Sequence, residues 1–269
     1  MKNNLQQFKF PEVRAYSWIA PAFIIVALIA TWELWVQLGD IPKWQLPAPS
    51  AIAAELVKSW SLLLHHGYIT TQEIVFGFLV ALVSGLLLAA ALVSSKILER
   101  AILPLLVSSQ TIPIIAIAPL LLIWVGYGLA SKIIVVALIS FYPIAVNTID
   151  GLKAINADMV AMMKSLGASR WQIFTKLQIP TAMPFMFSGI KVGISLSVIG
   201  AVIGEWVGAS GGLGYLITQS QPLFLTSRVF AAIFVLSVMG IGLFALAGLV
   251  ERLMLPWYYA EKRAKKANQ

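Results

Sequence analysis

The chain carries few side chains that could perform covalent or metal chemistry. Its 269 residues include no cysteine and two adjacent histidines, His65 and His66. Neighbouring residues do not share a helical face, and no acidic cluster accompanies the pair, so we expect loop residues here and not a metal site. A hydrolase needs a nucleophile with a base, or a metal ion. The sequence therefore predicts no catalytic residue and no metal-binding residue.

The run of glycines between Gly208 and Gly214 does not form a nucleotide site. It lacks the Gly-Lys-Ser/Thr ending of a phosphate-binding loop. We expect a tight turn there, leading into a re-entrant stretch. Nothing else in the sequence is suited to a triphosphate, so any ATP-driven process would depend on a separate subunit.

Four ionisable residues stand inside or beside long apolar runs, where such groups are functional candidates by default. Glu33, Glu73 and Lys191 lie close to the ends of their runs. For Glu33 and Lys191 we expect solvated ends that reach water by snorkelling. Glu205 is surrounded by small residues that favour burial, so we predict that it belongs to a translocation path or gate.

Uncharged polar residues within the apolar runs form a second set of candidates. Ser109, Gln110 and Thr111 lie among prolines, which free backbone carbonyls, and a membrane protein tolerates free carbonyls where they line a cavity. We place a translocation path beside these three residues and beside Asn147, Ser195 and Ser197. The alternative is that these side chains bond to carbonyls of their own helices.

The elements that must position these residues are apolar helices. Hydrophobic residues make up 59% of the sequence and charged residues 11%, whereas an average soluble domain has about 25% charged residues. The sequence thus predicts an all-α membrane protein. Six runs approach or exceed the roughly 20 residues that cross a bilayer as a helix: Trp18–Leu38, Thr70–Val93, Ala101–Val125, Lys132–Ile149, Phe185–Gly208 and Val229–Leu249. We read the first as an uncleaved anchor, because it is too long for a signal-peptide core and no small-x-small cleavage site follows.

The distribution of Lys and Arg predicts the orientation. With both termini in the cytoplasm, fourteen Lys and Arg residues lie in inner segments and four in outer ones, while Lys191 lies within the fifth run. Positive charge accumulates on the cytoplasmic side of membrane proteins. The net charge of +8 is therefore a topology signal and gives no support for nucleic-acid binding.

This topology divides the chain into segments. They are a cytoplasmic N-terminal segment (1–17), a first helix (18–38), an outer loop (39–69), a core (70–250) with an inner loop (150–184), and a basic cytoplasmic tail (251–269). In the outer loop, Ser50 can cap a short interfacial helix from Ala51 to Leu64. In the fifth run, small residues such as Gly189 and Gly193 recur every four positions. We expect close packing within the subunit, with contact to a second subunit as the alternative.

The inner loop predicts a helix–turn–helix. Met159, Met162, Met163 and Leu166 follow the i, i+3, i+4, i+7 spacing of an amphipathic helix. Gly167 can end that helix in a left-handed turn. A second helix would then be capped by Ser169 and closed by Pro180.

This loop resembles the EAA loop of bacterial binding-protein-dependent ABC importers. Gly167, Leu177, Ile179 and Pro180 stand at the spacings of that pattern, whereas its Glu-Ala-Ala triplet is replaced by Ala161, Met162 and Met163. Further segments resemble permeases of the nitrate, taurine and alkanesulfonate group, which includes importers of thiamine-precursor pyrimidines. They are Leu46–Ser50, Thr70–Glu73, Ala118–Leu120, Trp124–Gly128, Gly204–Glu205 and Gly208–Tyr215.

The resemblance implies a six-helix, type I ABC importer permease in the bacterial inner membrane. It implies two such chains, two cytosolic ATPase subunits that bind ATP and Mg²⁺, and a soluble or lipid-anchored substrate-binding protein. The coupling residues would be Ala161, Met162, Met163, Leu166, Gly167, Ala168, Ser169 and Arg170. The solute would be a sulfonate, taurine, nitrate or a pyrimidine-like heterocycle. A secondary transporter is the rival, but it normally shows paired halves and midplane ionisable residues, which we do not find.

Overall fold

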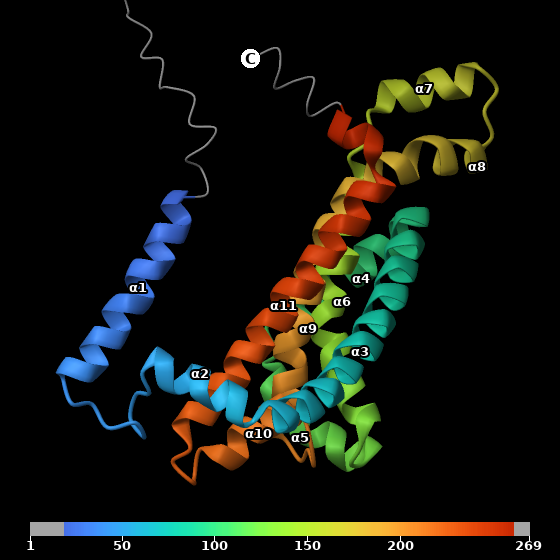
Figure 1. Cartoon of the computed structure of the whole chain (residues 1–269). Coiled ribbons are helices and arrows are strands. Elements are labelled where there is room, and N and C mark those ends of the chain that lie inside the picture. Colours follow the sequence, from blue (N-terminus) through green and yellow to red (C-terminus); the bar gives the residue numbers. More distant parts are fainter. Residues whose placement is uncertain (1–18, 261–269) are drawn as a thin grey trace, which may run out of the picture.

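Apolar helices make up the described part of the chain, residues 19–260, in this computed structural model (Figure 1). No strand occurs in this range. The predicted N-terminal segment and the end of the basic tail fall outside it. The elements are α1 (Ile19–Leu38), α2 (Pro49–Lys58), α3 (Trp60–Ser94), α4 (Lys96–Ser109), α5 (Ile114–Val125), α6 (Leu129–Lys153), α7 (Ala157–Ser165), α8 (Arg170–Ile173), the π-helix η1 (Phe174–Gln178), α9 (Ile179–Trp206), α10 (Leu213–Ser220) and α11 (Thr226–Met254).

The predicted spans are present, but the third one is not a single helix. Within residues 19–260, five helical segments are long and apolar enough to cross a membrane, namely α1, α3, α6, the stretch Arg170–Trp206 and α11. The sixth candidate is the pair α4 and α5, bent by 99°. The bend falls where Pro113 precedes α5, because a proline disfavours helical backbone in the residue before it.

Helix α6 forms the centre of the bundle, between α3 and α9. Glycines let these helices approach closely. A Cβ on Gly189 of α9 would lie 2.6 Å from the carbonyl oxygen of Pro143, and one on Gly77 of α3 would lie 2.4 Å from Cβ of Val136. The glycine face of the fifth span therefore packs within the subunit, which confirms the favoured interpretation.

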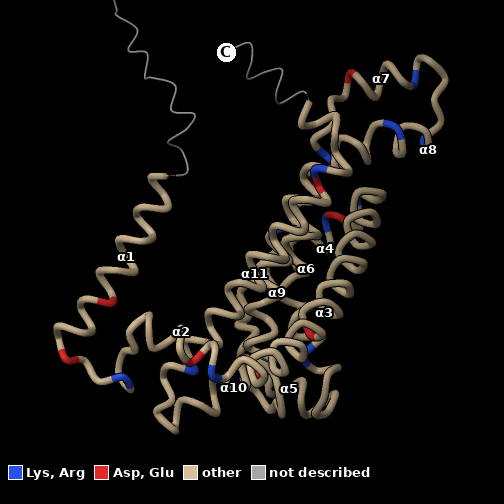
Figure 2. Tube along the Cα trace, in the orientation of Figure 1, with Lys and Arg blue, Asp and Glu red and all other residues tan. Residues whose placement is uncertain are grey.

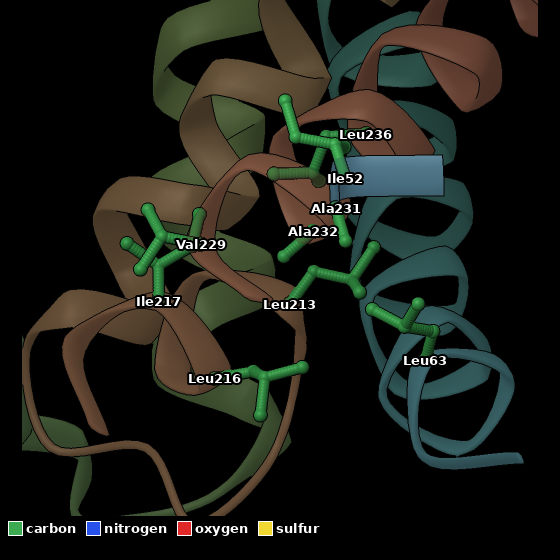
Figure 3. Packing of buried hydrophobic residues seen from close by; sticks show 9 residues of the cluster. All are labelled: Ile52, Leu63, Leu213, Leu216, Ile217, Val229, Ala231, Ala232 and Leu236. Carbon is green, nitrogen blue, oxygen red and sulfur yellow. The ribbon is translucent and has the colours of Figure 1, made fainter. Parts of the chain in front are cut away.

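The end of the bundle that carries α10 has its own apolar core (Figure 3). It joins α2, α3, α10 and α11 through Ile52, Leu63, Leu213, Leu216, Ile217, Val229, Ala231, Ala232 and Leu236. The bounds expected for the short helix, Ala51–Leu64, were wrong. Helix α2 begins at Pro49 with Ala48 as its N-cap residue and ends at Lys58, and α3 already begins at Trp60. Only Ser59 separates the two helices.

Helix α1 stands beside the bundle (Figure 1). Val36 is its only buried residue, and Trp32 reaches α11 with its ring 5.8 Å from that of Phe230. The rest of its apolar surface is exposed, as expected of a helix that faces lipid. Charged residues gather toward the two ends of the molecule (Figure 2), so its middle is apolar.

Candidate functional site

At one end of the molecule, α7 and α8 form an elbow that extends beyond the bundle (Figure 1). Asn156 caps α7 by accepting a hydrogen bond from the N–H of Asp158. The chain reverses at Gly167, whose φ is +78°. Ser169 then caps α8 in a reciprocal capping box with Gln172. The predicted helix–turn–helix, the left-handed glycine and the serine cap are all confirmed.

The elbow presents apolar side chains that nothing in the described chain covers. Met162 is 54% exposed, Leu166 78% and Trp171 70%, and α7 has no buried residue. The predicted coupling residues Ala161, Met163, Ala168 and Arg170 lie on the same elbow, with Met163 and Ala168 half-buried. Exposed apolar surface of this kind is typical of sites that contact another protein or a membrane.

The elbow connects to the transmembrane helix without an interruption. Residues Arg170–Trp206 form one helical stretch of 37 residues, made of α8, η1 and α9. The prediction that Pro180 closes a separate helix was wrong. A proline inside a helix removes one backbone hydrogen bond and bends the helix without necessarily ending it, and Pro180 lies directly after the π turn η1. The chain changes direction where α8 meets α9 (Figure 1), as expected at a π turn followed by proline.

At the opposite end, Glu205 caps α10. Its Oε2 accepts a hydrogen bond from the N–H of Gly214, and its Oε1 accepts one from Oγ1 of Thr70 at 2.6 Å. The side chain is 1% exposed, which confirms the expected burial. A carboxylate at a helix N-terminus is stabilised by the free N–H groups and by the helix dipole.

Helix α3 supplies two further hydrogen-bond acceptors at the N-terminus of α10. Oγ1 of Thr70 accepts from the N–H of Leu213 at 2.8 Å, and Nδ1 of His66 accepts from the N–H of Gly212 at 3.0 Å. His66 is therefore a buried helical residue, and its assignment to a loop was wrong. The missed signal is the spacing of His66, Thr70 and Glu73, which places three polar residues on one face of an apolar helix.

A buried ion pair lies beside this cap. Nζ of Lys132 on α6 is 3.0 Å from Oε1 of Glu73 on α3, with side chains 8% and 0% exposed. The carboxyl group of Glu73 also neighbours that of Glu205. Neither Glu73 oxygen has a hydrogen-bond donor within the described residues, so the attraction to Lys132 is electrostatic. We call His66, Thr70, Glu73, Lys132 and Glu205 the polar cluster; it joins α3, α6 and α9 to α10.

The predicted path residues do not converge on one cavity of the described chain. Ser109, Gln110 and Thr111 are exposed at the bend between α4 and α5, and Ser195 is exposed on α9, whereas Ser197 is buried. Several of them bond to their own helices: Asn147 donates to the Pro143 carbonyl, Ser195 to that of Lys191, Ser197 to that of Ile194 and Ser109 to that of Leu106. Exposed residues on these faces remain available to a path formed with another subunit.

The two charged residues expected at solvated ends also bond within the chain. Nζ of Lys191 is 2.8 Å from Oε2 of Glu251 on α11. Glu33 accepts hydrogen bonds from the backbone N–H of Ser50 at 2.9 Å and from its hydroxyl at 2.6 Å. Ser50 is thus not the predicted cap; Glu33 provides the acceptor at the start of α2. Among residues 19–260, no group of three or more His, Asp or Glu side chains is arranged to hold a metal ion.

Comparison with known proteins identifies close relatives. Residues 77–256 match the family described as "binding-protein-dependent transport system inner membrane component". A formylaminopyrimidine transport permease (ThiX) of Halalkalibacterium halodurans is 38% identical over 91% of this chain and 98% of its own. A riboflavin transport system permease (RibX) of Chloroflexus aurantiacus is 36% identical over 94% of this chain and 93% of its own. Permeases named for sulfonates, taurine and nitrate also match, at 25–30% identity, as the sequence resemblance predicted.

Solved structures agree with this fold. The MetNI methionine ABC transporter, in an inward-facing conformation, has a chain that superposes with a TM-score of 0.65 at 20% identity. The match covers 73% of this chain and 97% of that one. The expected type I importer permease fold is confirmed.

Proposed function

Because the chain belongs to the family of binding-protein-dependent transport system inner membrane components, it is a permease subunit of an ABC importer, and we propose that its solute is a small nitrogen heterocycle. Two of the three relatives above 35% identity are named for formylaminopyrimidine and riboflavin, which are both nitrogen heterocycles. Relatives named for sulfonates, taurine and nitrate reach lower identities, 25–30%.

The charges inside the membrane support an uncharged solute. Lys132 on α6 and Lys191 on α9 each pair with a carboxylate, Glu73 and Glu251 respectively. A path that favours anions would need positive charge that is not already neutralised. This pairing is the observation that favours a heterocycle over a sulfonate or nitrate.

The elbow is the element that we assign to energy coupling. A cytosolic ATPase subunit, which binds ATP and Mg²⁺, would dock on the exposed surface around Met162, Leu166 and Trp171. Support comes from their exposure and from the unbroken helix Arg170–Trp206, which joins the docking surface to the transmembrane core. Ala161 replaces the acidic residue of the family motif, so the contact at this position would be apolar.

We further propose that two copies of this chain form the path, with both termini and the elbow in the cytoplasm. The exposed polar residues Ser109, Gln110, Thr111 and Ser195 would face that path. The support for the orientation is the distribution of Lys and Arg along the sequence, with fourteen in the segments expected inside and four in those expected outside. Reporter fusions at residues 55, 130 and 220 should all indicate an outside location, and a cytoplasmic signal at any of them would overturn it.

Uptake by the complete importer in proteoliposomes tests the solute and the energy source together. The expected result is ATP-dependent uptake of labelled formylaminopyrimidine or riboflavin, delivered by the importer's own binding protein, with no competition from excess taurine. Uptake of taurine or nitrate without uptake of a heterocycle would overturn the proposed solute. Uptake that follows an ion gradient without ATP would favour the secondary transporter instead.

A further inference from the structure

The turn after α7 has a well-defined backbone motif. The N–H of Ala168 donates to the carbonyl of Met163 at 3.0 Å, and the N–H of Gly167 donates to that of Lys164 at 3.0 Å. These paired bonds define a Schellman motif, which requires left-handed backbone at Gly167. Glycine adopts that conformation without a steric penalty.

The turn after α10 has the same motif with phenylalanine at the left-handed position. The N–H of Leu225 donates to the carbonyl of Ser220 at 3.1 Å, and the N–H of Phe224 donates to that of Gln221 at 3.1 Å. The φ of Phe224 is +56°. A bulky residue in this conformation is strained, and such strain persists where the surrounding structure maintains it, often at functional sites.

Burial within the chain does not offset this strain. The side chain of Phe224 is 68% exposed. Its aromatic contact is with Trp44, edge to face, with ring centroids 6.0 Å apart, and Trp44 is itself 56% exposed. Leu223 beside them is 66% exposed. We call Trp44, Leu223 and Phe224 the aromatic knob.

The aromatic knob is held in place by the helices behind it. Oγ1 of Thr226, at the start of α11, donates to the carbonyl of Trp44 at 2.6 Å. Nε of Arg228 donates to Oε1 of Glu55 on α2 at 3.0 Å. A cavity of about 330 Å³ beside the knob is lined in part by Lys43, Glu55 and Arg228. A fixed apolar projection with charges of both signs around it has the composition of a protein-binding surface.

The knob lies at the end of the molecule opposite the elbow, in the loops that follow α1 and α10 (Figure 1). In the proposed orientation this end faces outward, where the importer's substrate-binding protein arrives. We propose that the aromatic knob is a docking site for that binding protein, inserting Phe224 into an apolar recess on its surface. This inference rests on the proposed orientation and function.

The strain favours a protein over the lipid interface as the occupant. Aromatic residues that anchor a protein at the membrane interface need only an apolar ring at the right depth. They gain nothing from a strained turn that fixes the direction of the ring. A fixed direction matters when the ring must fit a recess of defined shape, as the buried aromatic anchors of protein interfaces do.

Phe224→Gly separates docking from folding, because glycine removes the ring and also the strain. In the importer reconstituted in lipid nanodiscs, we expect unchanged basal ATPase activity and a permease melting temperature equal to or above that of the wild type. The concentration of binding protein that gives half-maximal ATPase stimulation should rise about tenfold, the loss typical of an interface anchor. The control is Trp60→Ala at the same end, where Trp60 is 57% exposed but outside the knob; it should leave that concentration unchanged.

A half-stimulating concentration for Phe224→Gly within twofold of the wild type would overturn the docking site, as would an equal effect of Trp60→Ala. If the wild-type importer itself shows no stimulation by its binding protein, the proposed function fails as well. The two failures are therefore distinguishable.

The absence of native cysteine allows a direct test of the occupant. In proteoliposomes, a single cysteine introduced by Phe224→Cys should react with a water-soluble maleimide and become protected when the binding protein is added. Protection that is already complete without binding protein would place the ring in lipid and overturn the proposal. Labelling that the binding protein does not change would also overturn it.

Discussion

Gly212 and the carboxyl group of Glu205 are so close that no further carbon fits between them. A Cβ on Gly212 would lie 2.2 Å from Cδ of Glu205, and the φ of Gly212 is +112°. The carboxylate can cap α10 only because this position has no side chain. The glycine run, which lacks the features of a nucleotide site, thus allows the N-terminus of α10 to contact the buried carboxylate of Glu205.

Gly212→Ala should therefore destabilise the end of the bundle that carries α10. Overpacking in a filled core costs about 1–3 kcal/mol, and the backbone of Gly212, in a region that essentially only glycine adopts, adds about 1–3 kcal/mol. We expect a lower melting temperature of the purified permease in detergent. The matched control is Gly242→Ala on α11, where a Cβ would meet nothing within 4 Å. Equal melting temperatures for the two variants would contradict the cap.

Lys132→Met should leave the carboxyl group of Glu73 without its cation. Breaking a buried ion pair from one side costs about 3–5 kcal/mol, so we expect a large loss of thermal stability and of folded protein in the membrane. Adding Glu73→Gln to Lys132→Met should recover much of that loss, because the uncompensated charge disappears. A double variant no more stable than the single one would show that charge compensation is not what the pair provides.

Gly167→Val should uncouple the elbow without affecting insertion. Nothing lies within 4 Å of a Cβ at this position, so the cost is the left-handed backbone alone, about 1–2 kcal/mol. We expect normal amounts of protein in the membrane but weaker co-purification of the ATPase or lower solute uptake. Gly167→Asn is the control, because asparagine tolerates left-handed backbone, and it should retain function. Normal uptake by the valine variant with a normally bound ATPase would show that the elbow only connects two helices and does not couple the ATPase to transport.

The contact between α2 and α11 should weaken in acid. Although partial burial raises the pKa of Glu55, hydrogen bonds from Ser59 and Arg228 lower it below its ordinary value of 4.5. A carboxyl whose folded pKa is lowered stabilises the fold above its unfolded pKa, and this stabilisation disappears as the pH falls through the lowered value. As the pH drops below about 4.5, the melting temperature of the wild type should therefore decrease. Part of this decrease should be missing in Glu55→Gln. Superimposable pH profiles would exclude this contribution.

Much of the local structure follows from local sequence. The apolar runs predict the helices, and the order Leu166, Gly167, Ser169 predicts both the left-handed turn and the cap, because each feature depends on residues within one or two turns. The break in the third span was also signalled, since prolines occur there. Its angle of 99° depends on how α4 and α5 pack, which no local pattern records.

The polar cluster could not be predicted from the sequence because its members are far apart along the chain. Thr70 and Glu205 are separated by 135 residues, and Lys132 lies on a third helix. Apolar runs mark where spans lie but not which faces meet. The second span was expected to start at Thr70, whereas α3 starts at Trp60. His66 was therefore not recognised as a residue of the helix that carries Thr70 and Glu73.

The unbroken helix from Arg170 to Trp206 has a mechanical consequence. Because α8 leaves the axis of α9 at an angle (Figure 1), a force applied to the elbow acts at a distance from that axis and exerts a torque on α9. A flexible loop at this point would dissipate the torque, whereas a continuous helix transmits it. The glycine contacts between α9 and α6 are too close for sliding, so both helices would rotate together as one rigid body.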